Sequence, residues 1–133
     1  MIELDGLYKV FPSIGTFADE LKFKKKYVNI LTRDKGRFKA VLEIENSVEP
    51  GMPDLLVINQ QDEAYLVEVK YARKGVITFK RSQIPWYKKY RDLNIYILAY
   101  NDKTKNVHYI NVVAILALNS GTTFRLIEEV KPI

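Results

Sequence analysis

The stretch GMPDLLVINQQDEAYLVEVK, residues 51–70, places two apolar runs on either side of a short polar segment. The runs DLLVI and AYLVEVKY are rich in β-branched and aromatic residues, which favour strands. The segment NQQDE between them is polar, as a tight turn requires. Because each run is apolar on both faces, we predict a β-hairpin of two central strands that are covered on both sides.

Charged side chains stand at the end of this hairpin that is far from the turn. Asp54 begins the first strand, and Glu68 and Lys70 lie near the end of the second. If the hairpin is centred on Gln61, the numbers of paired residues sum to 122, so Asp54 lies opposite Glu68 with Cβ atoms ~5 Å apart. Lys70 shares that face because strand side chains alternate with period two. A slip of one residue would put the two carboxylates on opposite faces.

Two carboxylates at that distance repel each other wherever the sheet excludes water. A proton, a cationic side chain or a metal ion can relieve the repulsion. Lys70 supplies one positive charge, and Mg²⁺ or Mn²⁺ would supply the rest, since hard ions prefer carboxylate and carbonyl oxygens. A metal-bound water could then attack a phosphodiester, with Lys70 either orienting that water or stabilising charge at phosphorus, the role we favour. The alternative is a solvated, inert set of charges at two strand ends.

Two helices are predicted around the hairpin. The first spans about 17–31 and begins with a capping signature at Thr16. Its apolar residues recur at helical spacing: Phe17, Leu21, Val28 and Leu31. The second spans about 78–93 with Thr78 as its N-cap. Since Pro85 lies inside this segment, the helix either begins near the proline or kinks there.

Further strands are predicted at 37–45, 94–100, 107–110 and 123–129, and we favour a short helix over a strand for 111–118. The resulting order over residues 16–100 is α-β-β-β-α-β, followed by a C-terminal addition over 101–133. This order predicts a single α/β domain with a mixed central sheet flanked by helices.

Composition narrows the class of protein. With 133 residues, of which 47% are hydrophobic, the chain can form one domain with a real core. It has no cysteine, which excludes disulfides, thiolate zinc sites and cysteine nucleophiles. No apolar run approaches the ~20 residues of a membrane span, so we expect a soluble cytoplasmic protein, cellular or virus-encoded. The net charge of +5 is compatible with a polyanionic partner.

The motif within this order resembles a known nuclease superfamily. PD, thirteen residues and then EVK is similar to the PD-(D/E)XK pattern, and the element order resembles its restriction-endonuclease-like core. The glycine before the motif and the glutamine in the following helix resemble archaeal Holliday-junction resolvases and small virus-type replication-repair nuclease modules. QIPWY, residues 83–87, also matches the Q-x₃-Y element of RecB-type and Cas4-like nucleases.

The resemblance implies a role for each matching residue. Asp54 and Glu68 would bind the metal together with the backbone carbonyl of Val69, and Lys70 would be the catalytic lysine. Gln83 would reach the site from the start of the second helix.

An additional acid often comes from the first helix in this superfamily, and Glu20 is our candidate. Glu20 could equally form an ordinary surface pair with Lys24, four residues later. Glu43, Glu45 and Glu49 are weaker candidates for the same position.

Basic residues gather in two segments that flank the predicted site. The candidate contacts to a DNA backbone are Lys24, Lys25, Arg73, Lys74, Lys80, Arg81, Tyr87 and Lys88. Such a rim neutralises phosphates without reading bases, although lysines on one exposed helix can also be a merely solvated face. We expect Gly75 to let a loop bend towards the cleaved strand. Trp86, Tyr87 and Tyr90 fit a core or interface better than a base-stacking platform, and His108 receives no role.

Together these features predict a Mg²⁺- or Mn²⁺-dependent DNA endonuclease. The resemblance implies a homodimer that selects branched DNA, as junction resolvases do in recombination, repair or replication, and that leaves a 5′-phosphate. A nicking enzyme, an exonuclease, a RecB- or Cas4-like nuclease and a non-catalytic nucleic-acid-binding protein with a nuclease fold remain alternatives.

Overall fold

The computed structural model describes residues 6–44, 49–119 and 121–133. Its elements in chain order are β1 (Tyr8–Phe11), α1 (Glu20–Arg33), β2 (Phe38–Glu43), β3 (Leu55–Asn59), β4 (Ala64–Ala72), β5 (Val76–Thr78), α2 (Gln83–Lys89), β6 (Ile95–Asn101), β7 (Val107–Asn111), α3 (Val112–Leu118) and β8 (Thr123–Arg125). Within this part of the chain, no helix combines the length and the apolarity needed to cross a bilayer.

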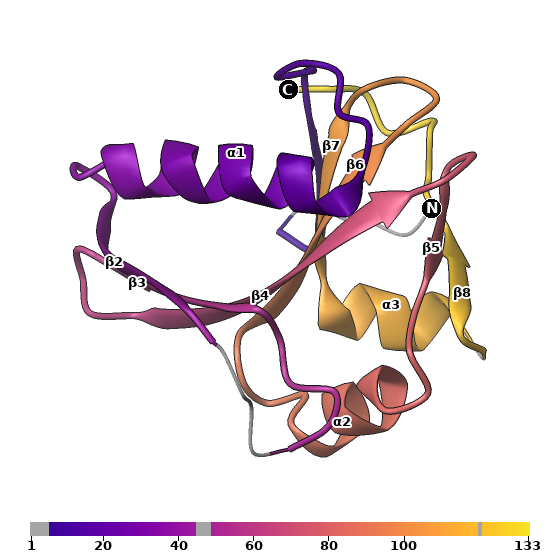
Figure 1. The fold of residues 1–133 in the computed structure, drawn as a ribbon. Helices are drawn as coiled ribbons and strands as arrows, with labels where there is room; N and C mark the ends of the chain where they lie inside the picture. The colour runs from indigo at the N-terminus through magenta and orange to yellow at the C-terminus, as the bar shows by residue number, and fades with distance from the viewer. Residues whose placement is uncertain (1–5, 45–48, 120) are drawn as a thin grey trace.

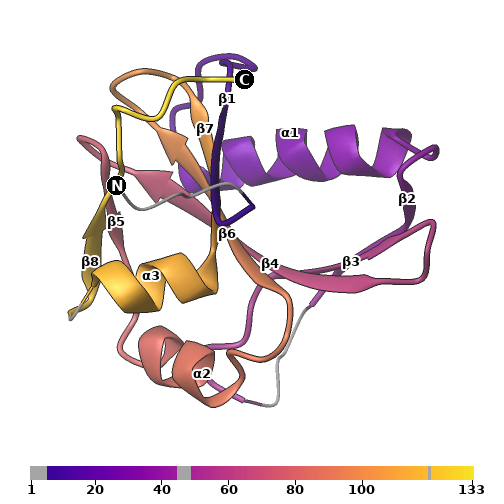
Figure 2. The same cartoon turned by 180° about the vertical axis from the view of Figure 1, so that it is seen from behind.

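A mixed six-stranded sheet forms the centre of the fold, in the order β1-β7-β6-β4-β3-β2. β4 and β6 run parallel, and the other neighbouring strands are antiparallel. α1 covers one face of the sheet, while α2 and α3 cover the other (Figures 1 and 2). The predicted α/β class with helices on both faces is therefore confirmed, and the predicted order α-β-β-β-α-β appears as α1-β2-β3-β4-α2-β6 with β5 inserted.

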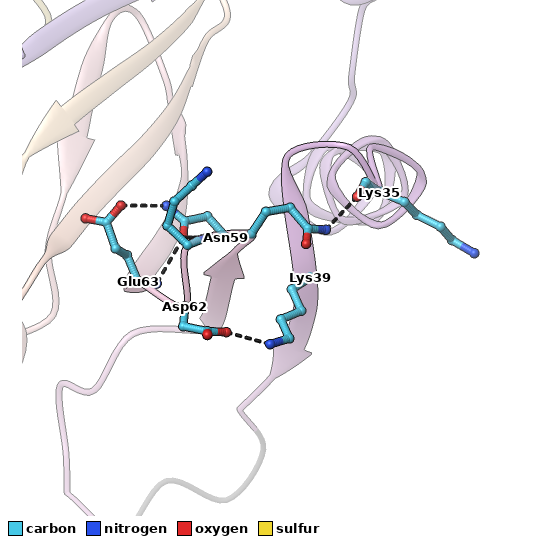
Figure 3. Close-up of polar contacts among 7 residues, drawn as sticks. Lys35, Lys39, Asn59, Asp62 and Glu63 are labelled. Atoms are coloured by element: carbon cyan, nitrogen blue, oxygen red, sulfur yellow. Dashed lines mark hydrogen bonds and ion pairs between the residues drawn. The ribbon is translucent and has the colours of Figure 1, made fainter.

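The hairpin register is the one predicted, with Leu55 paired to Val67. Figure 3 shows the polar turn that fixes it. The backbone N–H of Asn59 donates to the carbonyl of Glu63 at 3.0 Å, and the side-chain Oδ1 of Asn59 accepts from the backbone N–H of Glu63 at 2.9 Å. Asp62 takes the left-handed conformation that such turns need, with φ of 62°. One asparagine thus satisfies the turn with both its backbone and its side chain.

α1 begins later than predicted. Its N-cap is Asp19, whose side chain accepts from the backbone N–H of Lys22 at 2.9 Å, so the prediction of Thr16 as the cap is wrong. The reason is tertiary, because Phe17 is fixed to the sheet. Its N–H donates to the hydroxyl of Tyr100, and its carbonyl accepts from the hydroxyl of Tyr71.

The buried face of α1 also differs from the prediction. Leu21, expected in the core, is 60% exposed, whereas Phe23 is completely buried. Starting the helix at Glu20 rotates its apolar stripe, and Phe23 then packs in one cluster with Leu55 and Tyr100.

α2 starts at Gln83, close to Pro85, which was one of the two alternatives for this segment. Proline is tolerated there because the N–H groups of the first turn have no partner within the helix. Thr78 is not the N-cap of α2, because Thr78 pairs with Thr123 in a small β5–β8 sheet. The sequence pattern did not indicate this sheet.

The C-terminal segment 101–133 supplies part of the central sheet. β7 inserts between β6 and β1, and the predicted short helix at 111–118 is present as α3. The predicted strand at 123–129 is shorter and ends at Arg125. β1, which was not predicted, completes this side of the sheet by pairing with β7.

A buried hydrogen-bond chain joins the two ends of the protein at β7. The hydroxyl of Tyr8 accepts from the backbone N–H of Ile127 at 2.8 Å and lies 2.8 Å from Nδ1 of His108. Since the backbone N–H can only donate, the hydroxyl proton is available for Nδ1. Burial lowers the pKa of His108 to about 4, so the ring is neutral and accepts this bond.

Replacing Tyr8 with phenylalanine should therefore lower the free energy of unfolding by about 2 kcal/mol, because two buried polar groups lose their partner. Urea denaturation followed by circular dichroism measures this. Tyr65→Phe is the control, since among the described residues the Tyr65 hydroxyl takes part in one long hydrogen bond, 3.5 Å from Nδ2 of Asn59. Equal losses in both variants would contradict the role of the chain.

Candidate active site

The register of β3 and β4 brings Asp54 and Glu68 to the same end of the sheet. Leu55 pairs with Val67, so Asp54, one residue earlier, lies opposite Glu68. Oδ2 of Asp54 accepts from the backbone N–H of Val69 at 3.1 Å. The two carboxyl groups are close enough that a protonated Glu68 hydrogen-bonds to Asp54. The hairpin thus gathers the two acids named from the sequence.

Pro53 leaves a backbone oxygen of β4 without its strand partner. Asn59 and Glu63 face each other as a hydrogen-bonded pair. In an antiparallel ladder every second pair of opposite residues is hydrogen-bonded, so residue 53 and Val69 stand at the next such position beyond Leu55 and Val67. Proline has no N–H to give to the Val69 carbonyl. The Val69 N–H donates to Asp54 instead. Because the N–H and C=O of one strand residue point the same way, the Val69 carbonyl faces the side where Asp54 lies.

Glu68 is an unusual acid because it is only 5% exposed. Burial raises its pKa to about 9, and the negative charge of Asp54 adds to the rise. The positive charge of Lys70 opposes this shift, while Glu20 adds a smaller increase. At neutral pH Glu68 therefore holds a proton, which a cation arriving at the pair would displace.

Lys70 is buried beside Glu68 and has a defined partner. It is 7% exposed, and its Nζ donates to Oε1 of Gln83 at 2.8 Å. The same Oε1 accepts from the backbone N–H of Lys80 at 2.8 Å, so two donors fix the orientation of the amide. Nζ also lies 5.4 Å from the centre of the Phe79 ring. The start of α2 thus holds the ammonium group in place.

Gly51 docks the PD turn against the start of α2. Its φ of +96° favours glycine, and a Cβ there would lie 2.2 Å from the carbonyl oxygen of Ser82 and 2.9 Å from Cβ of Trp86. Only glycine permits this backbone approach. The contact explains the glycine of GMPD as a packing requirement that brings Asp54 and Gln83 to one place.

Glu49 fastens the same turn from its other end. Its carboxylate accepts from Nε1 of Trp86 at 2.9 Å and from the hydroxyl of Tyr90 at 2.7 Å, and Lys89 lies 3.8 Å away. These donors, the Tyr90 hydroxyl foremost, lower the pKa of Glu49. Its role is therefore attachment of the turn to α2, and it does not provide the additional acid considered above.

α1 contributes a cation to the site. Nζ of Lys24 lies 3.8 Å from Oδ1 of Asp54, whereas Glu20 is exposed at the same end of the helix. The alternative pairing of Glu20 with Lys24 is therefore not the contact that forms. Lys24 thus supplies a positive charge beside the acid pair, and its contact with DNA stays a prediction.

The site brings together two candidate side-chain ligands for a metal, Asp54 and Glu68. Among residues 6–44, 49–119 and 121–133, no group of three or more Asp, Glu, His or Cys side chains could hold an ion. Glu43 pairs with Leu55, on the α1 face of the sheet, and Glu45 lies outside the described residues. A metal would thus be held by Asp54, Glu68 and the Val69 carbonyl, an all-oxygen set that suits Mg²⁺ or Mn²⁺.

Most candidate DNA contacts are exposed, namely Lys25, Arg73, Lys74, Lys80, Arg81 and Lys88. Tyr87 is not one of them: its side chain is completely buried, so a surface contact with DNA is excluded and its place in the core is confirmed. Gly75 is also buried. Its φ of +76° forms the tight turn between β4 and β5, and an added Cβ there would meet Glu128, Lys103 and Asn101. The approach of this turn to a DNA strand stays a prediction.

The Tyr87 hydroxyl was missed as part of the site. It is buried with no hydrogen-bond partner among the described residues. Burial raises the pKa of Tyr87, and the negative charges of Glu68 and Asp54 raise it further. A neutral phenol therefore stands near the acid pair. The Q-x₃-Y spacing was the only sequence signal for it, and one helical turn explains why both its residues face the sheet.

No protein-family model matches this chain, and no curated protein matches it either.

Gly51→Ala should lower the free energy of unfolding by about 2–4 kcal/mol, because the added methyl group must push α2 away from the turn. Gly6→Ala is the matched control, since Gly6 has a similar φ of +80° but open space around it. Chemical denaturation measures both. The docking role fails if the two variants lose the same stability.

Glu68→Gln should make metal-free stability less dependent on pH. In the folded protein Glu68 keeps its proton up to about pH 9, whereas the unfolded chain loses it near 4.5. The folded state therefore binds more protons in this window, and the wild type loses stability as the pH rises. The free energy of unfolding of Glu68→Gln relative to the wild type should rise by about 1 kcal/mol or more from pH 5 to pH 9.

Thermal and urea melts in EDTA at several pH values test this. Glu129→Gln, an exposed acid, is the control and should show no comparable slope. A difference between Glu68→Gln and the wild type that stays constant or falls with pH would contradict the buried, protonated acid.

Proposed function

We propose that this protein is a metal-dependent DNA nuclease that hydrolyses phosphodiester bonds at Asp54, Glu68 and Lys70. One observation carries the proposal: two acids and an ammonium group converge at the open end of the hairpin, with Glu68 and Lys70 buried. Burying such groups lowers stability unless they serve another purpose. Their arrangement is what the PD-(D/E)XK resemblance implies.

The chemistry of the donor set supports Mg²⁺ or Mn²⁺ as the cofactor. Two carboxylates and a backbone carbonyl are ligands that hard divalent ions prefer. The Lys24 ammonium beside Asp54 supports the site's affinity for positive charge. When bound, the ion would supply an activated water and neutralise charge on a phosphate oxygen.

The chain's own residues then have separate tasks. Asp54 is oriented by the Val69 N–H, and Glu68 releases its proton to become a ligand. An ammonium group has three N–H donors, and the bond to Gln83 uses one. The others can bind non-bridging phosphate oxygens as charge grows there. The water oxygen would form a bond to phosphorus and lose a proton to solvent, while the P–O3′ bond breaks and the 3′-oxygen takes up a proton from solvent. A 5′-phosphate and a 3′-hydroxyl result.

The exposed basic residues support DNA as the substrate. Lys25 lies near the start of α1, and Lys80 and Arg81 lie just before the start of α2. Exposed cations therefore stand near the starts of the two helices that contribute Lys24 and Gln83 to the site. Such residues bind the backbone independently of sequence. Within the nuclease proposal we favour a homodimer that selects branched DNA, with nicking, exonuclease or RecB- and Cas4-like activity as alternatives.

A non-catalytic nucleic-acid-binding protein is the second candidate. It is favoured by the absence of a third acidic side chain at the pair within the described residues, and by a Glu68 that stays protonated at neutral pH. Such a protein would bind DNA equally well in EDTA and would never cut it.

Purified protein should cut plasmid or branched DNA with Mg²⁺ or Mn²⁺ and fail to do so in EDTA. Asp54→Asn, Glu68→Gln and Lys70→Met should each lower the rate at least about 100-fold, because the first two remove a ligand of the ion and the third removes a charge that binds the reacting phosphate. Gel assays with plasmid, fork, flap, four-way, linear and single-stranded substrates measure the rates and the substrate preference.

Matched controls are available on the surface. Asp92→Asn and Lys131→Met change exposed residues and should leave the rate unchanged. Binding without cutting under every metal condition would overturn the nuclease and support the binding protein. Cutting that persists in Asp54→Asn would point to a contaminating enzyme and remove the support for this site.

A further inference from the structure

A hollow of about 660 Å³ opens on the face of the sheet that α1 covers, at the turn end of the hairpin. The C-terminal half of α1 lines one side, and β2, β3, β4, β6, β7 and β1 contribute the floor. Asp54, Glu68 and Lys70 are not among its lining residues. The hollow is therefore separate from the proposed active site, and its volume lies in the range of small-ligand pockets.

Its floor is a row of aromatic rings on four neighbouring strands. Tyr65, Tyr96, Tyr109 and Phe11 come from β4, β6, β7 and β1, and we call this set the tyrosine row. Tyr96 and Tyr109 stack with centres 4.4 Å apart and planes within 5° of parallel. The ring centres of Tyr65 and Tyr96 are 5.9 Å apart, and those of Phe11 and Tyr109 are 6.5 Å apart. Tyr96 and Tyr109 are only half buried, so their rings are accessible.

The tyrosine hydroxyls gather in the same place. Burial raises the pKa of Tyr109, and the nearby hydroxyls of Tyr96, Tyr65 and Tyr27 raise it further. Within the described residues, only the Tyr65 hydroxyl of these four takes part in a side-chain hydrogen bond, a 3.5 Å contact from Asn59. Since Tyr96 and Tyr109 cover one face of each other, the hollow offers the remaining ring surfaces, with polar groups at their edges.

Cations stand at both ends of the row. Lys9 is the register partner of Tyr109 on the edge strand β1, and it is exposed. Arg37 lines the opposite end, where Asp34 lies 3.6 Å from it. Directly opposite residues on a sheet have Cβ atoms about 5 Å apart, so the Lys9 ammonium can reach a ligand on the row. Because Arg37 is paired with Asp34, Lys9 is the cation that an anionic group on the row would meet.

We infer that this hollow binds an unstacked nucleobase with its adjoining phosphate, the base stacking on an outer ring face of the tyrosine row and the phosphate at Lys9. Aromatic side chains on a sheet face are well suited to bases, because every base has a flat face that stacks on them. The tyrosine hydroxyls would bind the polar base edge. A free nucleotide and a single-stranded segment present the same chemistry, and the inference does not depend on the proposed nuclease activity.

The test uses NMR of the full chain with ¹³C-labelled tyrosine in EDTA, where no cutting can occur. The probes are thymidine and deoxyadenosine 5′-monophosphates, short single strands, and a duplex of the same sequence. Ring-current shifts should appear at Tyr65, Tyr96 and Tyr109 and not at Tyr90, which lies beside Glu49. Shifts with mononucleotides identify a free nucleotide as a sufficient ligand, and shifts with single strands alone identify a nucleic-acid segment.

Tyr96→Leu and Tyr109→Leu should each weaken binding about tenfold, because each removes a stacking ring and keeps an apolar side chain. Lys9→Gln should also weaken binding, and Lys131→Gln, an exposed lysine elsewhere, should not. Circular dichroism verifies that each variant is folded. The inference is overturned if no probe shifts the row at millimolar concentration, if the duplex binds there as well as the single strand, or if both folded leucine variants bind as the wild type does.

Discussion

The register of the β3–β4 hairpin is the constraint on which the rest of the site depends. Side chains alternate along a strand with period two, so a shift of one residue would send Asp54 and Glu68 to opposite faces. Asn59 prevents this slip by using its backbone and its side chain on the two limbs of the turn. A polar turn at one end of the hairpin thus determines which charges meet at the other end, five residues away from Asn59 at Asp54.

The PD turn acts on two structures at once. Pro53 has no N–H to give to the Val69 carbonyl, which leaves that carbonyl without its strand partner, while the Val69 N–H donates to the Asp54 side chain. Gly51 and Glu49 attach the same turn to α2, the helix that carries Gln83. Because Gln83 binds Lys70, the position of the turn and the position of the ammonium group are linked through one short helix.

Electrostatics explain why this end of the sheet favours a cation. Glu68 is buried next to Asp54, and its raised pKa means that the repulsion is relieved by a proton when no ion is present. Lys70 lies beside Glu68 and Lys24 beside Asp54, yet the pKa of Glu68 stays raised. Burying these charged groups lowers the stability of the fold, and a divalent ion would neutralise their repulsion. This is the physical reason to propose an ion there.

The sequence alone determined the hairpin, its register and the mixed α/β class, because these follow from local alternation, from turn residues and from residue spacing. It also predicted that Asp54, Glu68 and Lys70 meet, since their spacing places them at one end of two paired strands, whereas Gln83 was named through the resemblance. It misplaced the start of α1, because Phe17 is held by Tyr71 and Tyr100 from strands far along the chain. No local pattern contains such a contact.

Only the tertiary structure decided the partners of these residues. The ion pair of Lys24 with Asp54, the contact of Gly51 with Ser82 and the buried hydroxyl of Tyr87 all join segments that are distant in sequence. The tyrosine row is the clearest case, since its four rings come from strands whose order in the sheet differs from their order in the chain. Alternation shows which face a side chain takes, but the strand order decides its neighbours, and that order is fixed by packing.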